Sequence, residues 1–338
     1  MKNILKIINF NSLKHNIFCI KQNYSQICAV VKANAYGHGI KNIVPTLDEY
    51  VSYFAVNTIK EAHAVRKHSN RPILVLCGFS SSELKYASQN NIHLAVFCKK
   101  QLYTIQKYVA KYQKNVCLHL KIDSGMNRLG FKTADELKEV LDEINKNSHI
   151  KLCGIFTHFG GGHEERKTTQ KKRFKSLLEQ VNKNILVHCK SSNYIAENKI
   201  DENEMLRCGL AIYGYGNPNL KPILSIKAKI IFVGKAKKGE YIGYGTDNPA
   251  KKNITYAVLA IGYADGLMRN YAKKGYVIIN GKKAKICASI CMNMTIVDVS
   301  GISAKVGDYA TIMDEKLNAN EIAKMTNTIP YEVLTNFR

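Results

Sequence analysis

Short apolar runs recur along the first two thirds of the chain, and stretches with helical period separate most of them. The runs of strand length are 27–31, 53–57, 73–77, 92–97, 116–122, 152–156, 185–188 and 209–213. The stretches of helical period are 59–68, 81–88, 99–113, 133–145 and 168–181. Strands that alternate with helices in this number predict an α/β fold, a (β/α)8 barrel of the TIM type.

The pattern changes after Tyr215. From residue 220 to 314 the chain shows alternating strands and Gly-rich turns without a helical period, and a helix is expected only at 318–327. We therefore expect a barrel domain over 10–219 and a β-rich C-terminal domain over 220–338. The N-terminal strand within 1–9 precedes the first barrel strand and is expected to pair with the β-rich domain.

Composition fits two ordinary hydrophobic cores, since 46% of the 338 residues are hydrophobic. No window approaches the length of an apolar membrane span, and the first residues lack a secretory signal, so we expect a cytoplasmic protein without membrane contact. The ten cysteines are scattered without a CxxC pair, mostly inside apolar runs. They read as reduced, small hydrophobic residues, which predicts neither bound metal nor disulfides.

The formal charge of +24 could indicate a nucleic-acid partner. Basic residues are nevertheless spread over the whole length as pairs and triplets, with no stripe interleaved with aromatic residues. A general lysine-rich bias explains this distribution better than a nucleic-acid surface does. Such a surface would still attract small phosphorylated molecules.

Unusual polar residues follow the predicted barrel strands, where the active site of such a barrel lies. Lys32 follows the first strand, Arg128 lies after the fifth, His158 follows the sixth and Ser192 follows the seventh, while Arg207 opens the eighth. A lysine at a strand end is either a solvated charge or an amine that burial keeps partly neutral, so that it can attack a carbonyl.

Three motifs carry a resemblance to one family. Residues 31–39 read VKANAYGHG, residues 120–130 read LKIDSGMNRLG, and residues 205–214 read MLRCGLAIYG. The first resembles the pyridoxal-phosphate lysine motif of alanine racemases, and the other two are similar to further motifs of that family over nearly the full chain. The resemblance implies a fold-type III, pyridoxal-5'-phosphate-dependent isomerase that interconverts L-alanine and D-alanine and supplies D-alanine for peptidoglycan.

The resemblance also implies which residues bind the cofactor. Lys32 corresponds to the Schiff-base lysine, and Arg207 to the arginine that faces the pyridine nitrogen. Because a guanidinium keeps its proton, that arginine favours racemisation over reactions that need a stronger electron sink. The full set of implied cofactor residues is Lys32, Tyr36, Arg128, His158, Ser192, Arg207, Gly209, Leu210 and Tyr331.

Two bases on opposite faces of the α-carbon are implied by the same resemblance. Lys32 is one, and Tyr244 in YIGYGTD is the other. Tyr244 lies in the β-rich domain, so the analogy has it reaching into a partner's barrel in a homodimer with shared active sites. Arg128, Met292 and Tyr263 correspond to substrate-binding residues. The counterpart of Lys121 is carbamylated in some members.

The sequence departs from the family pattern at three places: Gly160–Gly162 after His158, Asn293 where an aspartate is usual, and an end at Arg338 that precedes the family's final RVPR-like segment. These departures leave open how active the chain is. The glycines are reminiscent of the related amino-acid decarboxylases. The alternatives are thus a broad-specificity amino-acid racemase, a decarboxylase of this fold, or a non-catalytic pyridoxal-phosphate carrier. Arg207, Tyr244 and the β-rich domain favour the racemase.

Overall fold

A computed structural model describes residues 3–161, 163–179, 181, 185–195, 204–244 and 249–337. Contacts divide the chain into two compact units. The first, called here the barrel unit, comprises residues 14–35 and 40–220. The second, called the β unit, comprises residues 1–13, 36–39 and 221–338.

The barrel unit is built on parallel strands that follow one another around the sheet in the order β8-β7-β6-β5-β4-β3-β2-β9. The strands are β2 (Ile27–Val30), β3 (Tyr53–Val56), β4 (Ile73–Val75), β5 (Ile92–Val96), β6 (Val116–Lys121), β7 (Ile150–Phe156), β8 (Leu186–His188) and β9 (Leu206–Cys208). The barrel closes between β8 and β9, because the Met205 amide donates to the Val187 carbonyl at 3.0 Å and the Arg207 amide to the Lys190 carbonyl at 3.1 Å. The predicted (β/α)8 barrel is confirmed.

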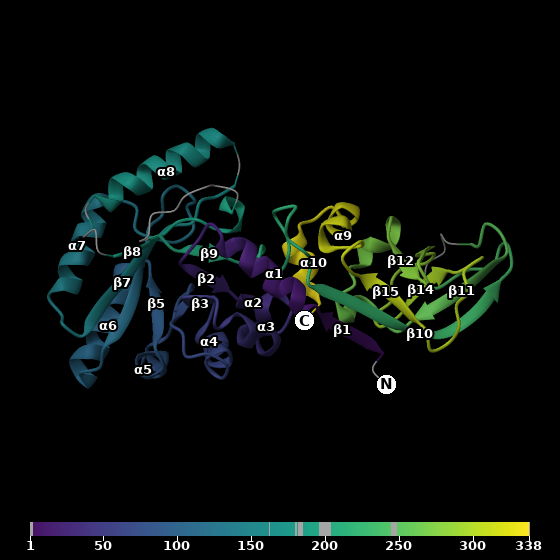
Figure 1. Ribbon diagram of the computed structural model, residues 1–338, viewed down its shortest axis with the longest axis horizontal. Helices are drawn as coiled ribbons and strands as arrows, with labels where there is room; N and C mark the ends of the chain where they lie inside the picture. The colour runs from purple at the N-terminus through teal and green to yellow at the C-terminus, as the bar shows by residue number, and fades with distance from the viewer. Residues whose placement is uncertain are drawn as a thin grey trace. The chain divides into compact units, whose positions relative to one another are not determined.

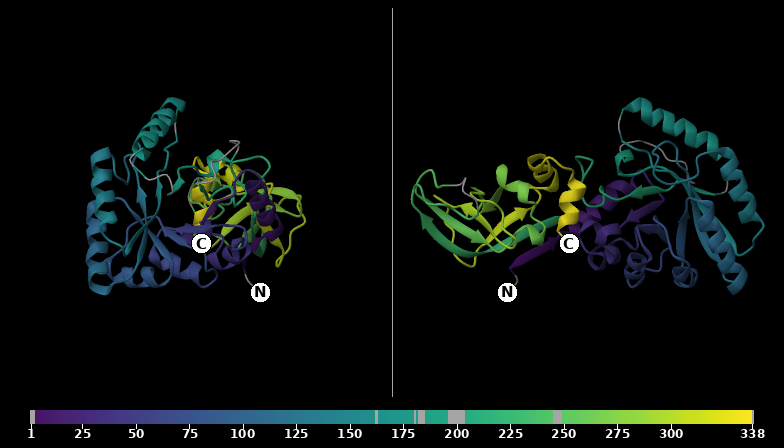
Figure 2. Two further views of the ribbon diagram at one scale, coloured as in Figure 1. Left: turned by 60° about the vertical axis from the view of Figure 1, so that its left-hand side comes forward. Right: turned by 180° about the vertical axis from the view of Figure 1, so that it is seen from behind.

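Helices lie on the outside of these strands (Figures 1 and 2). They are α1 (Phe10–Lys21), α3 (Ile40–Leu47), α4 (Ile59–Arg66), α5 (Leu84–Gln89), α6 (Lys99–Tyr112), α7 (Ala134–Asn145) and α8 (Glu164–Leu178). Helix α6 shows the reason for this packing: Leu102, Ile105 and Val109 fall on one face and are buried. The apolar stripe faces the sheet and leaves the charged face to solvent.

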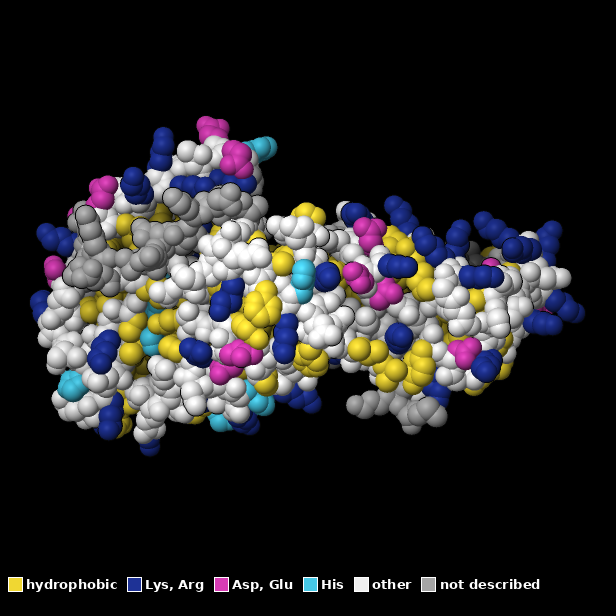
Figure 3. Space-filling view, viewed as in Figure 1, with side chains coloured by type: hydrophobic (Ala, Val, Ile, Leu, Met, Phe, Trp, Pro, Cys, Tyr) yellow, Lys and Arg dark blue, Asp and Glu magenta, His cyan; other side chains and the backbone are white. Residues whose placement is uncertain are grey.

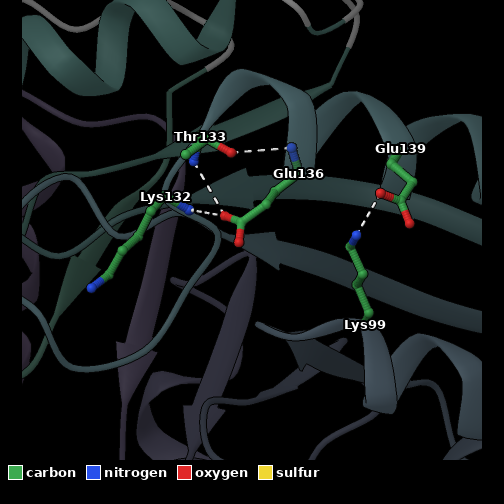
Figure 4. Close-up of polar contacts among 5 residues, drawn as sticks. All are labelled: Lys99, Lys132, Thr133, Glu136 and Glu139. Atoms are coloured by element: carbon green, nitrogen blue, oxygen red, sulfur yellow. Dashed lines mark hydrogen bonds and ion pairs between the residues drawn. The ribbon is translucent and has the colours of Figure 1, made fainter.

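The start of α7 is fixed by a capping box formed by Thr133 and Glu136 (Figure 4). Thr133 Oγ1 accepts from the Glu136 amide at 3.2 Å, and Glu136 Oε2 accepts from the amides of Thr133 at 3.2 Å and Lys132 at 2.8 Å. Lys99 of α6 forms an ion pair with Glu139 of α7 in the same view. Both partners of that pair are exposed, so the pair adds little stability.

The expected position of the eighth strand was wrong. Residues 209–213 form successive tight turns, with the Ile212 amide bonded to the Gly209 carbonyl and the Tyr213 amide to the Leu210 carbonyl. The strand is instead Leu206–Cys208, which pairs with β2. An apolar run is equally typical of a buried helical turn, and periodicity does not separate the two.

The β unit contains an antiparallel sheet with strand order β13-β12-β15-β10-β11-β14, and β1 pairs with β10 off this path. Its strands are β1 (Ile4–Ile8), β10 (Leu224–Ala236), β11 (Ile254–Leu259), β12 (Tyr276–Ile279), β13 (Lys282–Lys285), β14 (Thr295–Asp298) and β15 (Tyr309–Met313). Two helices follow, α9 (Ala319–Thr326) and α10 (Pro330–Asn336). This is the expected β-rich C-terminal part.

On the face shown in Figure 3, lysine and arginine side chains are spread over both units and do not gather in one patch. Among the described residues, every helix is too short or too polar to cross a bilayer.

Candidate active site

Lys32 stands directly after β2, where the chain makes an uncommon left-handed turn. Ala33, Asn34 and Ala35 have φ values of 52°, 54° and 55°, in the segment labelled α2 (Lys32–Tyr36). Each such residue costs about 1–2 kcal/mol relative to a right-handed one. The turn is held by a hydrogen bond from the Ala35 amide to the Val31 carbonyl at 2.8 Å. Backbone strain next to the lysine is thus fixed by the surrounding fold, as is common at functional sites.

Glu61 of α4 is a second support of this turn, and sequence reasoning missed it. Its carboxylate accepts from the Ala33 amide at 2.6 Å and from the Asn57 amide at 2.8 Å. Glu61 therefore anchors the residue that follows Lys32. The available signal was Thr58-x-x-Glu61, a helix N-cap pattern, which does not reveal the additional contact with residue 33.

The loop that carries Arg128 is shaped by Asp123. Asp123 Oδ1 accepts from the amides of Gly125, Met126 and Asn127 at 3.0, 2.9 and 3.0 Å, and Oδ2 accepts from the Arg128 amide at 3.1 Å. Burial raises the pKa of Asp123, but these four backbone hydrogen bonds outweigh burial and lower its pKa overall. The charged Asp123 carboxylate therefore holds the loop and positions Arg128. This role was not predicted from the sequence.

Gly130 lets this loop return to the barrel wall. Its φ is +130°, and a Cβ at this position would lie 2.5 Å from the Asp123 nitrogen and 2.8 Å from the Lys121 oxygen. The Phe131 amide then bonds to the Lys121 carbonyl at 2.9 Å. Only glycine fits this close approach of two backbones.

Four of the predicted residues form a cationic cluster around a fifth, His158, at the ends of the barrel strands. Burial, and then the charges of Arg207, Lys121, Arg128 and Lys32, lower the pKa of His158 to about 3. Burial and the charges of Arg207 and Arg128 likewise lower the pKa of Lys121 to about 8. His158 is therefore neutral at pH 7. The cluster is suited to an anionic ligand that would compensate the accumulated positive charge.

Arg207 is buried and its guanidinium is held on two sides. Its Nη1 donates to His188 Nδ1 at 2.9 Å and also to the His188 carbonyl, and Nη2 donates to the Thr157 carbonyl at 2.6 Å. Burial and the nearby charge of Arg207 lower the pKa of His188 well below its usual value, so the imidazole stays a neutral acceptor. The arrangement fixes the orientation of Arg207. His188 was not singled out from the sequence.

Ser192 and the turn after β9 converge. Ser192 Oγ accepts from the amide of Gly209 at 3.1 Å and from that of Ala211 at 3.2 Å. The expectation that the amides of Gly209 and Leu210 hold the cofactor phosphate stays a prediction. The contacts of Ser192 involve the amides of Gly209 and Ala211, on either side of Leu210.

The remaining predicted residues belong to the β unit. The rings of Tyr36 and Tyr331 lie 6.0 Å apart between centroids. Gly262 brings two segments together: the Tyr263 amide bonds to the Cys291 carbonyl at 3.0 Å, and the Ala264 amide to the Met292 carbonyl at 2.9 Å. Tyr263 and Met292 are thus adjacent and exposed.

Tyr244 is the most exposed large residue of this set, with 70% of its surface accessible. Its base is firm. Ile242 is buried in a small core with Ala288, and Gly243 has a φ of +67° with no room for a side chain against Ala288. The turn therefore presents the tyrosine outward. Gly162 and Arg338, two positions of departure from the family pattern, lie outside the described residues.

An eight-stranded parallel barrel with a cationic cluster at its strand ends, followed by an antiparallel β unit, defines a two-domain barrel protein suited to a phosphorylated ligand. The family described as "Alanine racemase, N-terminal domain" matches residues 8–218, and "Alanine racemase, C-terminal domain" matches residues 223–338. The chain belongs to the alanine racemase family.

Individual relatives agree over almost the whole length. The chain is 36% identical to an alanine racemase of Borreliella burgdorferi over 350 residues, covering 98% of this chain and 94% of that one. It is 34% identical to an alanine racemase of Helicobacter pylori over 357 residues, covering 97% of this chain and 95% of that one.

Solved structures give the same result. The alanine racemase of Clostridium difficile 630 superposes with a TM-score of 0.93 at 30% identity, covering all of this chain and 94% of the other. An alanine racemase from Bartonella henselae with covalently bound pyridoxal phosphate superposes with a TM-score of 0.89 at 26% identity, covering all of this chain and 98% of the other.

Proposed function

We propose that this chain is a pyridoxal-phosphate-dependent isomerase that interconverts L-alanine and D-alanine and so supplies D-alanine for cell-wall peptidoglycan. Family membership over both units supports this function. The single structural observation that carries it is the cluster of Lys32, Arg128, Arg207 and Lys121 around the neutral His158. We place the enzyme in the cytoplasm, where a chain with ten cysteines is kept reduced.

The residues present fit the cofactor. An anionic phosphate would compensate the four positive charges that, after burial, lower the pKa of His158. Ser192 Oγ accepts from the amides of Gly209 and Ala211, which leaves its hydroxyl proton as a donor of the kind that phosphate binding uses, and we assign Gly209 as a further phosphate-binding residue. We assign Lys32 as the covalent attachment point and His158 as the neighbour of the ring. Tyr36, Leu210 and Tyr331 complete the cofactor set. When bound, pyridoxal phosphate withdraws electrons from the α-carbon of the amino acid.

Arg207 has the role of limiting that electron withdrawal. Its guanidinium is held by His188 and by the Thr157 carbonyl, and it keeps its proton at physiological pH. A partner that cannot give up a proton leaves the ring nitrogen unprotonated. We infer that this favours reversible removal of the α-proton over loss of the carboxylate, which distinguishes the racemase from a decarboxylase.

Two groups of this chain exchange the proton in our proposal. The Lys32 Nζ takes the α-proton on one face, and the Tyr244 Oη holds the proton that is delivered on the other face. Arg128 binds the substrate carboxylate, with Met292 and Tyr263 at the entrance. Lys121 supports Arg128. Its pKa of about 8 leaves about a tenth of the amine neutral at pH 7, which permits carbamylation by carbon dioxide.

We further propose a homodimer in which Tyr244 serves the barrel of the partner subunit. Three observations support this arrangement: the 70% exposure of Tyr244, the 57% exposure of Met292 and the 45% exposure of Tyr263. Exposed large residues gathered in one unit are typical of a surface that another chain covers.

One assay tests the function directly. The purified protein, loaded with pyridoxal phosphate, is incubated with L-alanine in heavy water, and D-alanine and α-deuteration are followed together. We expect both enantiomers to accumulate α-deuterium. Release of carbon dioxide would identify a decarboxylase. Binding of the cofactor without turnover of several amino acids would identify a carrier, and turnover of many amino acids at similar rates would identify a broad-specificity racemase.

A further inference from the structure

A line of polar side chains runs through the interior of the barrel, away from the candidate active site. His188 Nε2 lies 2.8 Å from His119 Nδ1, and His119 Nε2 lies 3.2 Å from His93 Nδ1. All three imidazoles are buried. Branched apolar residues usually fill such a barrel. Gly154 leaves space for the His119 ring, since a Cβ at position 154 would lie 2.5 Å from His119 Nδ1.

Arg207 fixes the direction of every hydrogen bond in this line. A guanidinium only donates, so His188 Nδ1 must accept and the proton of His188 must sit on Nε2. His188 Nε2–H then donates to His119 Nδ1, and His119 Nε2–H donates to His93 Nδ1. Neutral His93 therefore carries its proton on Nε2. The position of the proton on each of the three imidazoles thus follows from the donor Arg207 at one end of the line.

The line ends at two cysteines. A ring nitrogen of His93 and the sulfurs of Cys117 and Cys153 all lie within 4.8 Å of one another. With Nδ1 of His93 accepting from His119, the Nε2–H is the group that can donate to the Cys117 sulfur. A thiolate is the stronger acceptor for such a donor. The neighbouring Cys153 and His93 lower the pKa of Cys117, against the opposing effect of burial.

The two sulfurs differ in character. The adjacent Cys117 sulfur, and then burial, raise the pKa of Cys153, whose thiol donates to the Lys151 carbonyl at 3.6 Å. Cys117 is therefore the sulfur that ionises first, whereas Cys153 keeps its proton. This is the arrangement of an attacking thiolate beside a second thiol that can resolve it.

The pair lies at the end of the barrel where the strands begin. Cys117 is the second residue of β6, and His93 is the second residue of β5. Both cysteines are partly exposed. Cys153 sits at the register shift between β6 and β7, which are neighbouring strands. Backbones of paired strands are about 5 Å apart, within the range that disulfides span.

We propose that Cys117 and Cys153 form a reactive dithiol that small hydroperoxides oxidise reversibly to a disulfide. The Cys117 sulfur attacks one peroxide oxygen, the O–O bond breaks, and water or an alcohol leaves after protonation. The Cys153 sulfur then attacks the sulfenic sulfur of Cys117, the S–O bond breaks, and the Cys153 proton leaves with the oxygen as water. The two thiols lose two electrons and the peroxide gains them.

A three-ligand metal site is the competing use of the same atoms. It is disfavoured, because an imidazole ligand needs an unprotonated nitrogen. His93 Nδ1 accepts from His119, and its Nε2 carries the proton that Arg207 dictates through the line. Metal binding through His93 would have to break this line at one of its contacts.

Alkylation of the native protein tests the proposal without any variant. Iodoacetamide labelling is followed per cysteine by peptide mass spectrometry from pH 6 to pH 8, with the partly exposed Cys98 as internal control. An ordinary thiol reacts about 100-fold faster at pH 8 than at pH 6. We expect the rate at Cys117 to change less than about twofold. A pH profile at Cys117 that matches Cys98 would overturn the proposal.

Oxidation and variants complete the test. Hydrogen peroxide should give a cross-linked peptide that contains Cys117 and Cys153. The variant Cys153→Ser should instead leave a dimedone-reactive sulfenic acid at Cys117, and Cys117→Ser should leave Cys153 unoxidised. His93→Phe should shift the pH profile of Cys117 upward. A zinc or copper ion retained at one per chain in native mass spectrometry, with both thiols protected, would replace the dithiol by a metal site.

Discussion

The variant Asp123→Asn tests how strongly the Asp123 carboxylate holds the loop that carries Arg128. The side chain keeps its shape, so Oδ1 can still accept from the amides of Gly125, Met126 and Asn127, now without a charge. Each of these bonds weakens by about 0.5 kcal/mol, because charge-assisted bonds are roughly twice as strong as neutral ones. The Arg128 amide loses its acceptor and faces an NH2 group, which costs about 1 kcal/mol more.

These terms give a loss of about 2–3 kcal/mol in the free energy of unfolding at pH 7, or a Tm lower by about 5–10 °C for a unit of this size. Urea denaturation of the wild type, Asp123→Asn and Asp142→Asn measures it. Asp142 is an exposed residue of α7, so its variant makes the same charge change without the four amides. We expect Asp142→Asn to stay within about 0.5 kcal/mol of the wild type.

The stabilising effect of Asp123 should also depend on pH in a defined direction. The pKa of Asp123 is lower in the folded protein than its usual value, so its contribution is complete above about pH 4 and is lost as the pH falls through the folded pKa. The stability gap between the wild type and Asp123→Asn should therefore be constant from pH 7 to pH 5 and shrink below pH 4. A variant as stable as Asp142→Asn at pH 7, or a gap that stays unchanged at low pH, would refute this reasoning.

Three further outcomes are expected. Gly130→Ala should lower the free energy of unfolding, measured by urea denaturation, by about 3–5 kcal/mol because a Cβ meets backbone at 2.5 Å. Gly161→Ala, with nothing within 4 Å, should be near neutral, and equal effects would contradict the steric argument. Protein incubated with ¹³C-bicarbonate should give a carbamate NMR signal that grows from pH 6 to pH 8, because the Lys121 amine, with a pKa of about 8, loses its proton over this range. Lys121→Met should abolish that signal. A signal that depends neither on pH nor on this residue would argue against carbamylation of Lys121. Tyr244→Phe should lower the racemisation rate by about 10²–10⁴-fold, while one enantiomer still exchanges its α-proton in heavy water. Tyr241→Phe, which changes another exposed tyrosine, should leave the rate unchanged. A normal rate in Tyr244→Phe would show that Tyr244 is not the second base.

The barrel could be predicted from the sequence because its signal is local. Each of the first seven strands was placed to within a few residues by an apolar run such as 92–97. The eighth was misplaced because residues 209–213 are buried on all sides in a turn, and burial gives the same apolar pattern in a turn as in a strand. Helix α10 was not predicted, since seven residues that begin with a proline carry little periodicity.

The supporting residues of the site could not be predicted for a different reason. Glu61, Asp123 and His188 act through contacts whose geometry depends on closing loops or on strands far apart in the chain. The same holds for Cys117 and Cys153, which the sequence presents as isolated small hydrophobes 36 positions apart and which the pairing of β6 with β7 brings together. Spacing along the chain contains no trace of such a pairing.

The central claim is that Lys32 of one chain and Tyr244 of another serve the same substrate carbon, and subunit complementation tests it most directly. Lys32→Ala and Tyr244→Phe are each purified as inactive protein, mixed in equal amounts, dissociated and reassembled. If the site is shared, each mixed dimer contains one intact site, and the mixture should regain about a quarter of the wild-type specific activity. A mixture that stays as inactive as its two components would contradict the account.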